Sequence, residues 1–489
     1  MTGPRHDRSQ GARRPDSTPA EDLVPQNGRE LALAALWEFD DSGAYLAASL
    51  DDYDTRPLAP PDRGLAMELS YGILRRRATL DAVLRTVVSR PQEKVEPELW
   101  TLLRLGAMQL LLMPGLPPHA AVHETVEAAR RIGMQRWTGL ANGVLRSLLR
   151  KLAPEARMDA EPSASGIPVM ALRPGDGAAA DPVVEVRYRR FAEPVFPDPH
   201  SDPDGYLAEA FSIPRLLLDR WPESLDFSEK LRRAAWFAGA GVMTLRVNAL
   251  RTTRDGFLAA LTKAGVAAAP GRFAESVRLA GTQRIAALPG FDEGWFSVQD
   301  ESATAIVDLL ALQPGEAVLD LCSAPGGKAT HAAERMQDQG RVVACDVGAA
   351  RLWAVRESAR RLGLTCIETA EVGETGEGVP AGPFDAAIVD APCSNTGVLG
   401  KRPEVRWRLQ DKDFQELPEK QFALLMSAAE RIRPGGRLLY STCSIDAAEN
   451  EAVVRRFLGT SSRFALTREL QSLPGRPADG GYAALLKAR

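Results

Sequence analysis

The chain has 489 residues, of which 45% are hydrophobic and 25% charged, the ordinary composition of a folded protein with several domains. Its formal net charge of -4 excludes a protein whose whole surface is basic and binds nucleic acid, so any RNA contact must come from local basic patches. No apolar run approaches the roughly 20 residues of a membrane-spanning helix. The five cysteines, none in a CxxC pair, indicate a reducing cytoplasm and predict neither a disulfide framework nor a metal site.

The N-terminal part of the chain divides into three regions of different composition. Residues 1–27 are polar and contain no apolar signal core, which predicts a disordered arm. Over residues 28–155 apolar side chains recur at spacings of three and four, which predicts an all-α domain of six or seven helices. Residues 156–205 are rich in Pro, Ala, Gly and Asp, and we expect a mostly irregular linker or insertion there.

Basic residues concentrate near the end of the helical domain. The stretch 130–151 contains six Arg and Lys residues and no acidic residue. Such a stretch is either a solvated basic face or a face that binds the phosphate backbone of RNA, and the sequence leaves both interpretations open. The candidate RNA contacts are Arg130, Arg131 and Arg136.

The C-terminal part of the chain contains a small domain and a large one. Residues 206–290 predict a small α+β subdomain. Residues 291–489 alternate between strand and helix patterns, which is typical of a Rossmann-like α/β domain with a mainly parallel sheet. Ligands bind at the carboxyl ends of the strands in such sheets, so the loops that follow the strands are the candidate site.

One of these loops has the features of a cofactor site. Small residues let the backbone approach a ligand closely, and the helix that follows offers free N–H groups. Asp346 ends the next strand, about 20 residues past the glycines, where a ribose diol is usually bound. The loop lacks the GxGxxG and GKS patterns of phosphate-binding loops, so the pattern favours S-adenosyl-L-methionine over a plain strand-to-helix turn. The loop residues are Cys322, Ser323, Ala324, Pro325, Gly326, Gly327 and Lys328.

Two cysteines lie in short motifs directly after strand-like runs. Cys393 belongs to Asp390-Ala-Pro-Cys-Ser, and Cys443 belongs to Ser-Thr-Cys-Ser. Carbon 5 of cytosine accepts a methyl group only after a thiolate adds to carbon 6, which requires an activated thiol, a group at ring nitrogen 3 and a base. Asp390 is the candidate for the ring contact. Packing in a core is the alternative for any single cysteine, and we assign it to Cys345 and Cys366.

With these motifs the chain resembles the Sun/Fmu (RsmB-type) RNA cytosine-5 methyltransferases over nearly its whole length, the N-terminal arm and residues 156–205 excepted. The resemblance implies a seven-stranded sheet, with Cys443 as the nucleophile and Cys393 assisting product release. It places cofactor contacts at residues 322–328, at Asp346 and at Asp390. Glu371 stands where the family usually carries an Asp that contacts the adenine.

The resemblance also concerns the substrate. Residues 396–407 match the substrate segment of the family, and we expect Arg406 and Trp407 to contact RNA. The helical domain resembles the NusB-type RNA-binding module, which implies a small-subunit (16S) ribosomal RNA substrate. The expected protein is a cytoplasmic monomer with no metal and no membrane partner. A transfer RNA cytosine-5 methyltransferase and a catalytically dead RNA-binding or ribosome assembly factor remain as alternatives.

Overall fold

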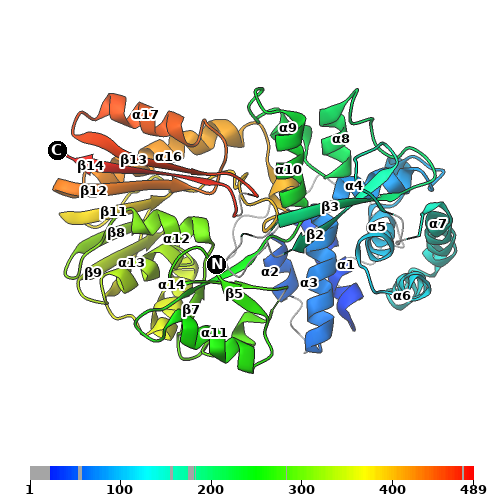
Figure 1. The fold of residues 1–489 in the computed structure, drawn as a ribbon, viewed down its shortest axis with the longest axis horizontal. Coiled ribbons are helices and arrows are strands. Elements are labelled where there is room, and N and C mark those ends of the chain that lie inside the picture. Colours follow the sequence, from blue (N-terminus) through cyan, green and yellow to red (C-terminus); the bar gives the residue numbers. More distant parts are fainter. Residues whose placement is uncertain are drawn as a thin grey trace. The chain divides into compact units, whose positions relative to one another are not determined.

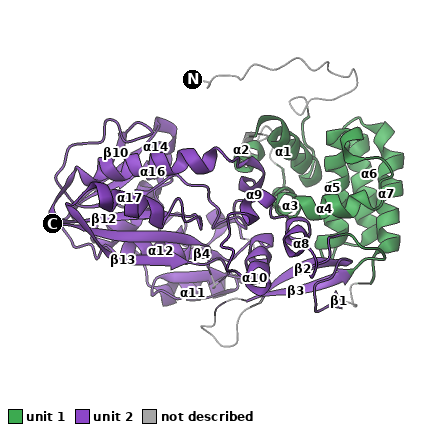
Figure 2. Cartoon of the chain, turned by 90° about the horizontal axis from the view of Figure 1, so that it is seen from above, with its two compact units in different colours: residues 1–157, 190–195 green, residues 158–189, 196–489 purple. Residues whose placement is uncertain are grey.

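The computed structural model describes residues 23–43, 45–52, 58–154, 158–173, 181, 183–281, 283–475 and 478–489. Most of the expected N-terminal arm lies outside these residues. The chain forms two compact units, one of residues 1–157 and 190–195, the other of residues 158–189 and 196–489 (Figure 2). Among the helices of the described ranges, none has both the length and the apolar character needed to cross a membrane.

The first unit is a helical bundle, as predicted. Its central helix α5 is buried along almost its whole length, and a Cβ atom at Gly106 would lie 2.6 Å from Leu145 of α7, so these two helices pack closely. Asn27 caps the first helix by accepting hydrogen bonds from the backbone N–H groups of Arg29 and Glu30. The helices are α1 (Gly28–Ser42), α2 (Leu46–Asp52), α3 (Pro60–Arg75), α4 (Arg77–Arg85), α5 (Pro97–Leu112), α6 (Pro118–Arg131) and α7 (Thr138–Lys151).

The expectation of a mostly irregular segment over residues 156–205 is wrong. The described part of this segment forms a three-stranded sheet in the order β1 (Met158–Asp159), β3 (Val183–Arg190), β2 (Gly166–Arg173). Ile167 and Tyr188 are buried beneath it. A composition averaged over some 50 residues hid two short strands, because the Gly, Ala and Asp residues cluster between them rather than within them.

The small α+β subdomain has the predicted character. Helices α8 (Pro203–Ala210), α9 (Arg215–Leu218) and α10 (Phe227–Ala238) precede a four-stranded sheet that carries α11 (Arg254–Lys263). Its core includes Phe257 stacked on Phe296, with ring centroids 4.9 Å apart. The strand order is β5 (Ala268–Pro270), β6 (Ser276–Leu279), β4 (Met243–Val247), β7 (Phe296–Val298).

The C-terminal domain contains the predicted seven-stranded, mainly parallel sheet (Figure 1). Five neighbouring strands are parallel, and β14 pairs antiparallel with both β12 and β13. The order is β10 (Ile367–Glu371), β9 (Arg341–Asp346), β8 (Ala317–Leu321), β11 (Phe384–Asp390), β12 (Ile432–Thr442), β14 (Gly481–Ala488), β13 (Phe464–Ser472).

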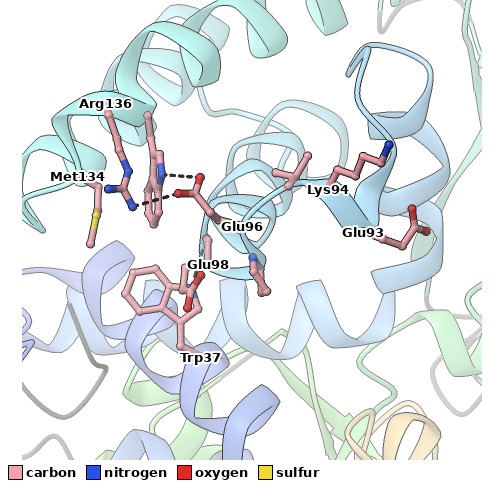
Figure 3. Close-up of a pocket in the computed structure, with 10 residues that line it drawn as sticks. Trp37, Glu93, Lys94, Glu96, Glu98, Met134 and Arg136 are labelled. Atoms are coloured by element: carbon pink, nitrogen blue, oxygen red, sulfur yellow. Dashed lines mark hydrogen bonds and ion pairs between the residues drawn. The ribbon is translucent and has the colours of Figure 1, made fainter. Parts of the chain in front are cut away.

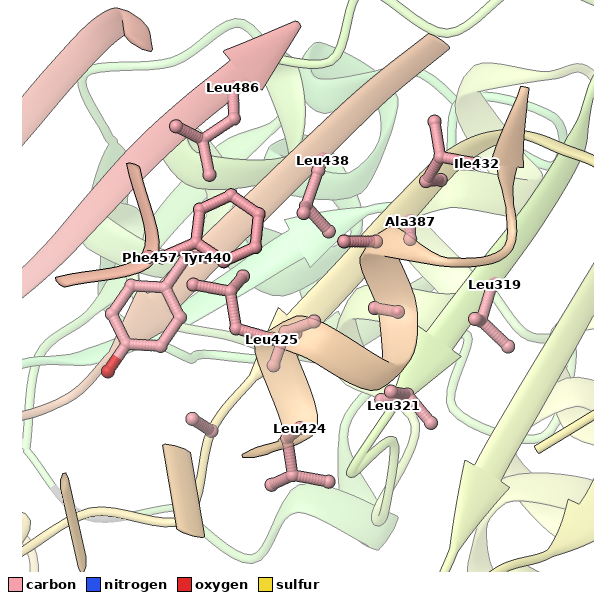
Figure 4. Packing of buried hydrophobic residues seen from close by; sticks show 14 of the residues in the cluster. Leu319, Leu321, Ala387, Leu424, Leu425, Ile432, Leu438, Tyr440, Phe457 and Leu486 are labelled. Carbon is pink, nitrogen blue, oxygen red and sulfur yellow. The ribbon is translucent and has the colours of Figure 1, made fainter. Parts of the chain in front are cut away.

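Successive residues of the central strands face two separate cores. Leu319 packs in the core under α16 (Asp413–Ala429) and α17 (Glu451–Thr460), where Leu424, Leu438 and Phe457 also lie (Figure 4). Val318 points to the other core, formed with α12 (Glu301–Asp308), α13 (Gly327–Arg335) and α14 (Ala349–Leu362). Burial on both faces explains why these strands are continuous apolar runs, and it leaves their ends as the place for polar chemistry.

Candidate active site

Three adjacent parallel strands bring the predicted motifs to one edge of the sheet. Strand β11 lies between β8 and β12, and Asp390 at the end of β11 is in register with Ser441 of β12. The loop 322–328 follows β8, Cys393 follows β11, and Cys443 follows β12. The sheet order therefore groups the cofactor loop with both cysteines, which stand 50 residues apart in the sequence.

The two cysteine thiols are in direct contact. The Sγ atoms of Cys393 and Cys443 lie 3.2 Å apart. A hydrogen bond from Cys393 lowers the pKa of the Cys443 thiol in spite of its burial, whereas the same bond, together with burial, raises the pKa of Cys393. These opposite shifts favour Cys443 over Cys393 as the thiol that ionises.

Asn395 is a residue of this site that the sequence analysis missed. Its Oδ1 lies 3.1 Å from the Cys443 sulfur, and its Nδ2 donates to the Cys393 carbonyl at 2.8 Å. Its backbone adopts the left-handed region with φ of 56°, which Asn tolerates better than most residues. The exposed Arg402 donates to the same Oδ1 at 3.2 Å, and its charge helps to lower the pKa of Cys443. The sequence signal that could have indicated Asn395 was a polar amide residue two positions after Cys393.

Asp390 connects the cofactor loop to the cysteine strands. Its Oδ2 pairs with Lys328 Nζ at 2.6 Å, and its Oδ1 accepts a hydrogen bond from Ser441 Oγ at 2.9 Å. Burial alone would lower the pKa of Lys328, but the attraction of Asp390 outweighs it, so the pKa lies above its ordinary value. Lys328 is therefore a fixed positive charge, and the carboxylate of Asp390 remains about one-third exposed toward ligands.

The cofactor loop fits a cationic ligand that carries a ribose. Gly326 has a φ of 100° where α13 begins, and the position of a Cβ at Gly327 is nearly open, with its nearest neighbour 3.9 Å away. The fully buried Asp320 directs Oδ2 to Ser323, while its Oδ1 has no hydrogen-bond partner. Burial raises the pKa of Asp320 to about 7. A buried carboxylate with a free oxygen suits the positive end of S-adenosylmethionine.

Asp346 and Glu371 stand side by side at the ends of β9 and β10, where they are in register. The Asp346 carboxylate accepts hydrogen bonds from the backbone N–H groups of Ala324 and Val347 and pairs with Arg351 at 2.6 Å. These bonds hold it against the cofactor loop. Glu371 is exposed at the neighbouring position.

Arg406 does not lie where an RNA contact is expected, and that interpretation is wrong. Only 3% of the residue is exposed, and its guanidinium donates to the carbonyl groups of Phe211, Ser212, Phe237 and Leu399. Its role is structural, because it joins the substrate segment to the small subdomain. The sequence could not distinguish this buried Arg from the exposed Arg402 in the same basic run. Trp407 is half-buried.

The arginines of the helical unit lie on its surface but are not free of acidic partners. Arg130 pairs with Glu127, Arg131 with the buried Glu30 at 2.7 Å, and Arg136 with Glu96 at 3.0 Å. Glu96 accepts hydrogen bonds from both Arg136 and Trp137. Arg136 and Glu96 point toward one another (Figure 3) and line a cavity whose volume is about 380 Å³. Glu30 and Glu96 come from other parts of the bundle, and Glu127 lies on α6 just before the basic stretch, so a stretch without acids in the sequence is not an unpaired basic face.

A second hollow of the same unit lies between α6 and α7. Its volume is about 820 Å³, and its lining combines apolar residues with basic and polar ones. Arg130 and Arg146 are among the lining residues, as are His119 and His123 one helical turn apart on α6. Glu127 also lines this groove, where it pairs with Arg130.

Comparisons with known proteins bear on each part of this architecture. Residues 307–476 match the family described as 16S rRNA methyltransferase RsmB/F, residues 26–150 the NusB family, and residues 214–286 the RsmF/B-like ferredoxin-like domain. A probable ribosomal RNA small subunit methyltransferase B of Synechocystis sp. is 33% identical over 437 residues, which is 88% of this chain and 89% of that protein. The chain belongs to the RsmB family.

Further relatives agree with this assignment. Ribosomal RNA small subunit methyltransferase B of Salmonella arizonae is 33% identical over 472 residues, 94% of this chain and 99% of the relative. The crystal structure of PH0851 has the same fold, with a TM-score of 0.69 at 23% identity over 95% of this chain and 99% of that one. This RsmB-family protein is an RNA methyltransferase that depends on S-adenosylmethionine.

Proposed function

We propose that this RsmB-family enzyme methylates carbon 5 of a cytosine in small-subunit ribosomal RNA through a covalent bond to Cys443. The observation that carries the proposal is the contact of 3.2 Å between the thiols of Cys393 and Cys443 beside the cofactor loop. The lowered pKa of Cys443 by itself would fit any enzyme with a thiol nucleophile, so it does not identify this reaction. A second thiol in contact with the first fits a reaction in which one sulfur must add to the ring and later leave it.

The reaction begins with addition of the Cys443 thiolate to carbon 6, which moves an electron pair to carbon 5. S-adenosylmethionine, when bound, would supply the methyl group that carbon 5 attacks, and the broken bond between sulfur and the methyl carbon would leave S-adenosylhomocysteine. A base then removes the proton from carbon 5, the double bond between carbons 5 and 6 re-forms, and the Cys443 thiolate leaves. Cys393 assists this release from its position against the departing sulfur. Asp390, held by Lys328 and Ser441, contacts the ring edge at nitrogen 3.

The cofactor contacts follow from the same edge of the sheet. We assign the backbone of residues 322–328 and the carboxylate of Asp390 to the methionine part, and Asp346 to the ribose hydroxyl groups. Glu371, exposed beside Asp346, is assigned to the adenine side. The buried Asp320 supplies negative charge for the sulfonium or ammonium group.

The RNA substrate is assigned from the relatives, which are named ribosomal RNA small subunit methyltransferases. We assign RNA contacts to Trp407 and to the exposed Arg402, which bonds to Asn395 beside Cys443, and phosphate contacts to Arg130 and Arg136. The retained thiol pair argues against a catalytically dead assembly factor. Transfer RNA remains an alternative substrate for the same chemistry.

Bisulfite sequencing tests the reaction and the substrate together. Small-subunit ribosomal RNA and transfer RNA incubated with the enzyme and S-adenosylmethionine should show one new protected cytosine in the ribosomal RNA only. Cys443→Ala should lower the rate at least about a thousandfold, while binding of S-adenosylhomocysteine persists. Cys366→Ala, a half-buried thiol away from the site, is the matched control. Near-normal transfer by Cys443→Ala would refute the covalent mechanism.

A further inference from the structure

A serine follows each catalytic cysteine, and both serines bind one buried carboxylate. Ser394 donates to Glu449 through its backbone N–H, at 2.8 Å to Oε1, and through its hydroxyl to Oε2. Ser444 donates its hydroxyl to the same Oε2 at 2.6 Å. Glu449, Ser394 and Ser444 are each at most 1% exposed. The Glu449 side chain therefore joins the loops that carry Cys393 and Cys443, in addition to direct bonds between the loops such as that of Ser394 Oγ with Ser444 Oγ at 3.1 Å.

Glu449 is itself held at two places, at its carboxylate by Gln421 and at its backbone carbonyl by Tyr440. Gln421 of α16 donates to Oε1 at 3.0 Å and to the carbonyl of Pro392 at 3.0 Å. Tyr440 of β12 donates to the Glu449 carbonyl at 2.5 Å. Burial raises the pKa of Glu449, although the bonds from Ser394 and Ser444 oppose this shift. Both oxygens of the Glu449 carboxyl group are therefore engaged by the cysteine loops.

We propose that Glu449 is a positioning residue that sets the separation of the Cys393 and Cys443 thiols. The inference rests on the proposed two-thiol mechanism, in which the sulfur atoms must stay in contact while one adds to the ring and leaves it. The two loops also meet directly, because the Gly397 N–H donates to the Cys443 carbonyl at 2.9 Å and the hydroxyl groups of Thr396 and Ser444 lie 2.9 Å apart. The serine-to-glutamate bonds act one residue from each thiol, so they control the orientation of the sulfur atoms.

Two substitutions of Glu449 separate the effect of its side-chain length from the effect of its charge. Glu449→Gln keeps the length of the side chain: its carbonyl can accept from the Ser394 N–H, and its amide can donate to both serine hydroxyls, which also accept. Glu449→Asp keeps the charge but is one methylene shorter, so it cannot reach both loops. A positioning role predicts that Gln preserves the site better than Asp, whereas a role as a base or a fixed charge predicts the reverse.

The separation of the thiols can be measured without RNA or cofactor. Diamide takes two electrons and two protons from a pair of thiols and joins them in a disulfide, at a rate that depends on their proximity. Mass spectrometry of non-reduced peptides then gives the rate for the Cys393–Cys443 pair. We expect Glu449→Asp and Ser444→Ala to slow disulfide formation at least about tenfold and single-turnover methyl transfer about a hundredfold. Glu449→Gln should stay within a few-fold of wild type in both measurements.

Glu419→Asp is the matched control, because this exposed residue pairs with Arg456 on the surface and the same methylene is removed. Binding of S-adenosylhomocysteine and thermal unfolding show that each variant is folded. The positioning role is wrong if Glu449→Asp forms the disulfide as fast as wild type, or if Glu449→Gln is the slower variant. Failure of the covalent mechanism would appear separately, as transfer by Cys443→Ala with the disulfide rates still ordered as expected.

Discussion

The catalytic edge of the sheet and the basic face of the helical unit use charge in opposite ways. At the catalytic edge, Lys328 and Glu449 are largely or fully buried, and they bond to groups far away in the sequence, Asp390 and Ser394. Asp320 is also fully buried and accepts a hydrogen bond from the nearby Ser323. On the helical unit, Arg130 and Arg136 are exposed and pair with nearby or neighbouring acids at the surface. Single changes should therefore have large effects at the first site and small, salt-dependent effects at the second.

The largest effect is expected at the thiol pair. Cys393→Ala removes the hydrogen bond that lowers the pKa of Cys443, so addition should be slower but should still occur, while release is blocked. A denaturant-resistant complex of protein and RNA should therefore accumulate, and turnover should fall at least about a hundredfold. Denaturing gel electrophoresis measures the complex. The double variant Cys393→Ala with Cys443→Ala is the control and should form none. A normal turnover rate without a complex would assign release to another group.

Arg406 tests whether burial predicts a structural effect. Arg406→Ala removes a guanidinium that four carbonyl groups accept from, and should lower the free energy of unfolding by about 2–4 kcal/mol. Arg402→Ala, the same change at an exposed position, should alter it by less than about 0.5 kcal/mol. Denaturant titration followed by fluorescence measures both. Unchanged stability together with weakened RNA binding in Arg406→Ala would restore the original assignment.

The buried Asp320 should give stability a pH dependence. Since burial raises its pKa from 3.8 to about 7, the folded protein keeps a proton that the unfolded chain loses between these values. Stability without cofactor should therefore fall as the pH rises from about 4 to about 7. Asp320→Asn should remove roughly 1–3 kcal/mol of this decrease. Unfolding curves across this pH range measure it, with the surface variant Asp292→Asn as control. Parallel curves for wild type and Asp320→Asn would show that Asp320 is ionised throughout.

The smallest effect is expected on the helical unit. Replacing both Arg130 and Arg136 by Gln should weaken RNA binding only several-fold, because each must first exchange a glutamate for a phosphate. The salt dependence of binding should become shallower, while single-turnover chemistry at saturating RNA should not change. Filter binding at several salt concentrations measures this, with Arg360→Gln as an exposed, acid-paired control. Slower chemistry on bound RNA would move these residues into the reaction. Arg131 is omitted because its loss would leave the buried Glu30 uncompensated.

The sequence by itself determined the fold class and the motifs of the site. Continuous apolar runs predict parallel strands, and apolar residues at helical spacing predict the bundle. The motifs around Lys328, Cys393 and Cys443 each follow such a run directly, so the sequence alone places them at strand ends. These features are local, so a single chain displays them. The strands β2 and β3 were missed because each is short and the Gly- and Ala-rich sequence between them weakens the local strand signal.

Only the tertiary structure decided which of these residues meet. The sheet order places β11 between β8 and β12, which brings Cys393 against Cys443 and both near Lys328. It also buries Arg406 among backbone carbonyls and gives the arginines of the helical unit their acidic partners. Burial, pairing and the resulting pKa shifts depend on groups far away in the chain. Local patterns cannot contain them, because the energy of a charge or a thiol depends on everything packed around it.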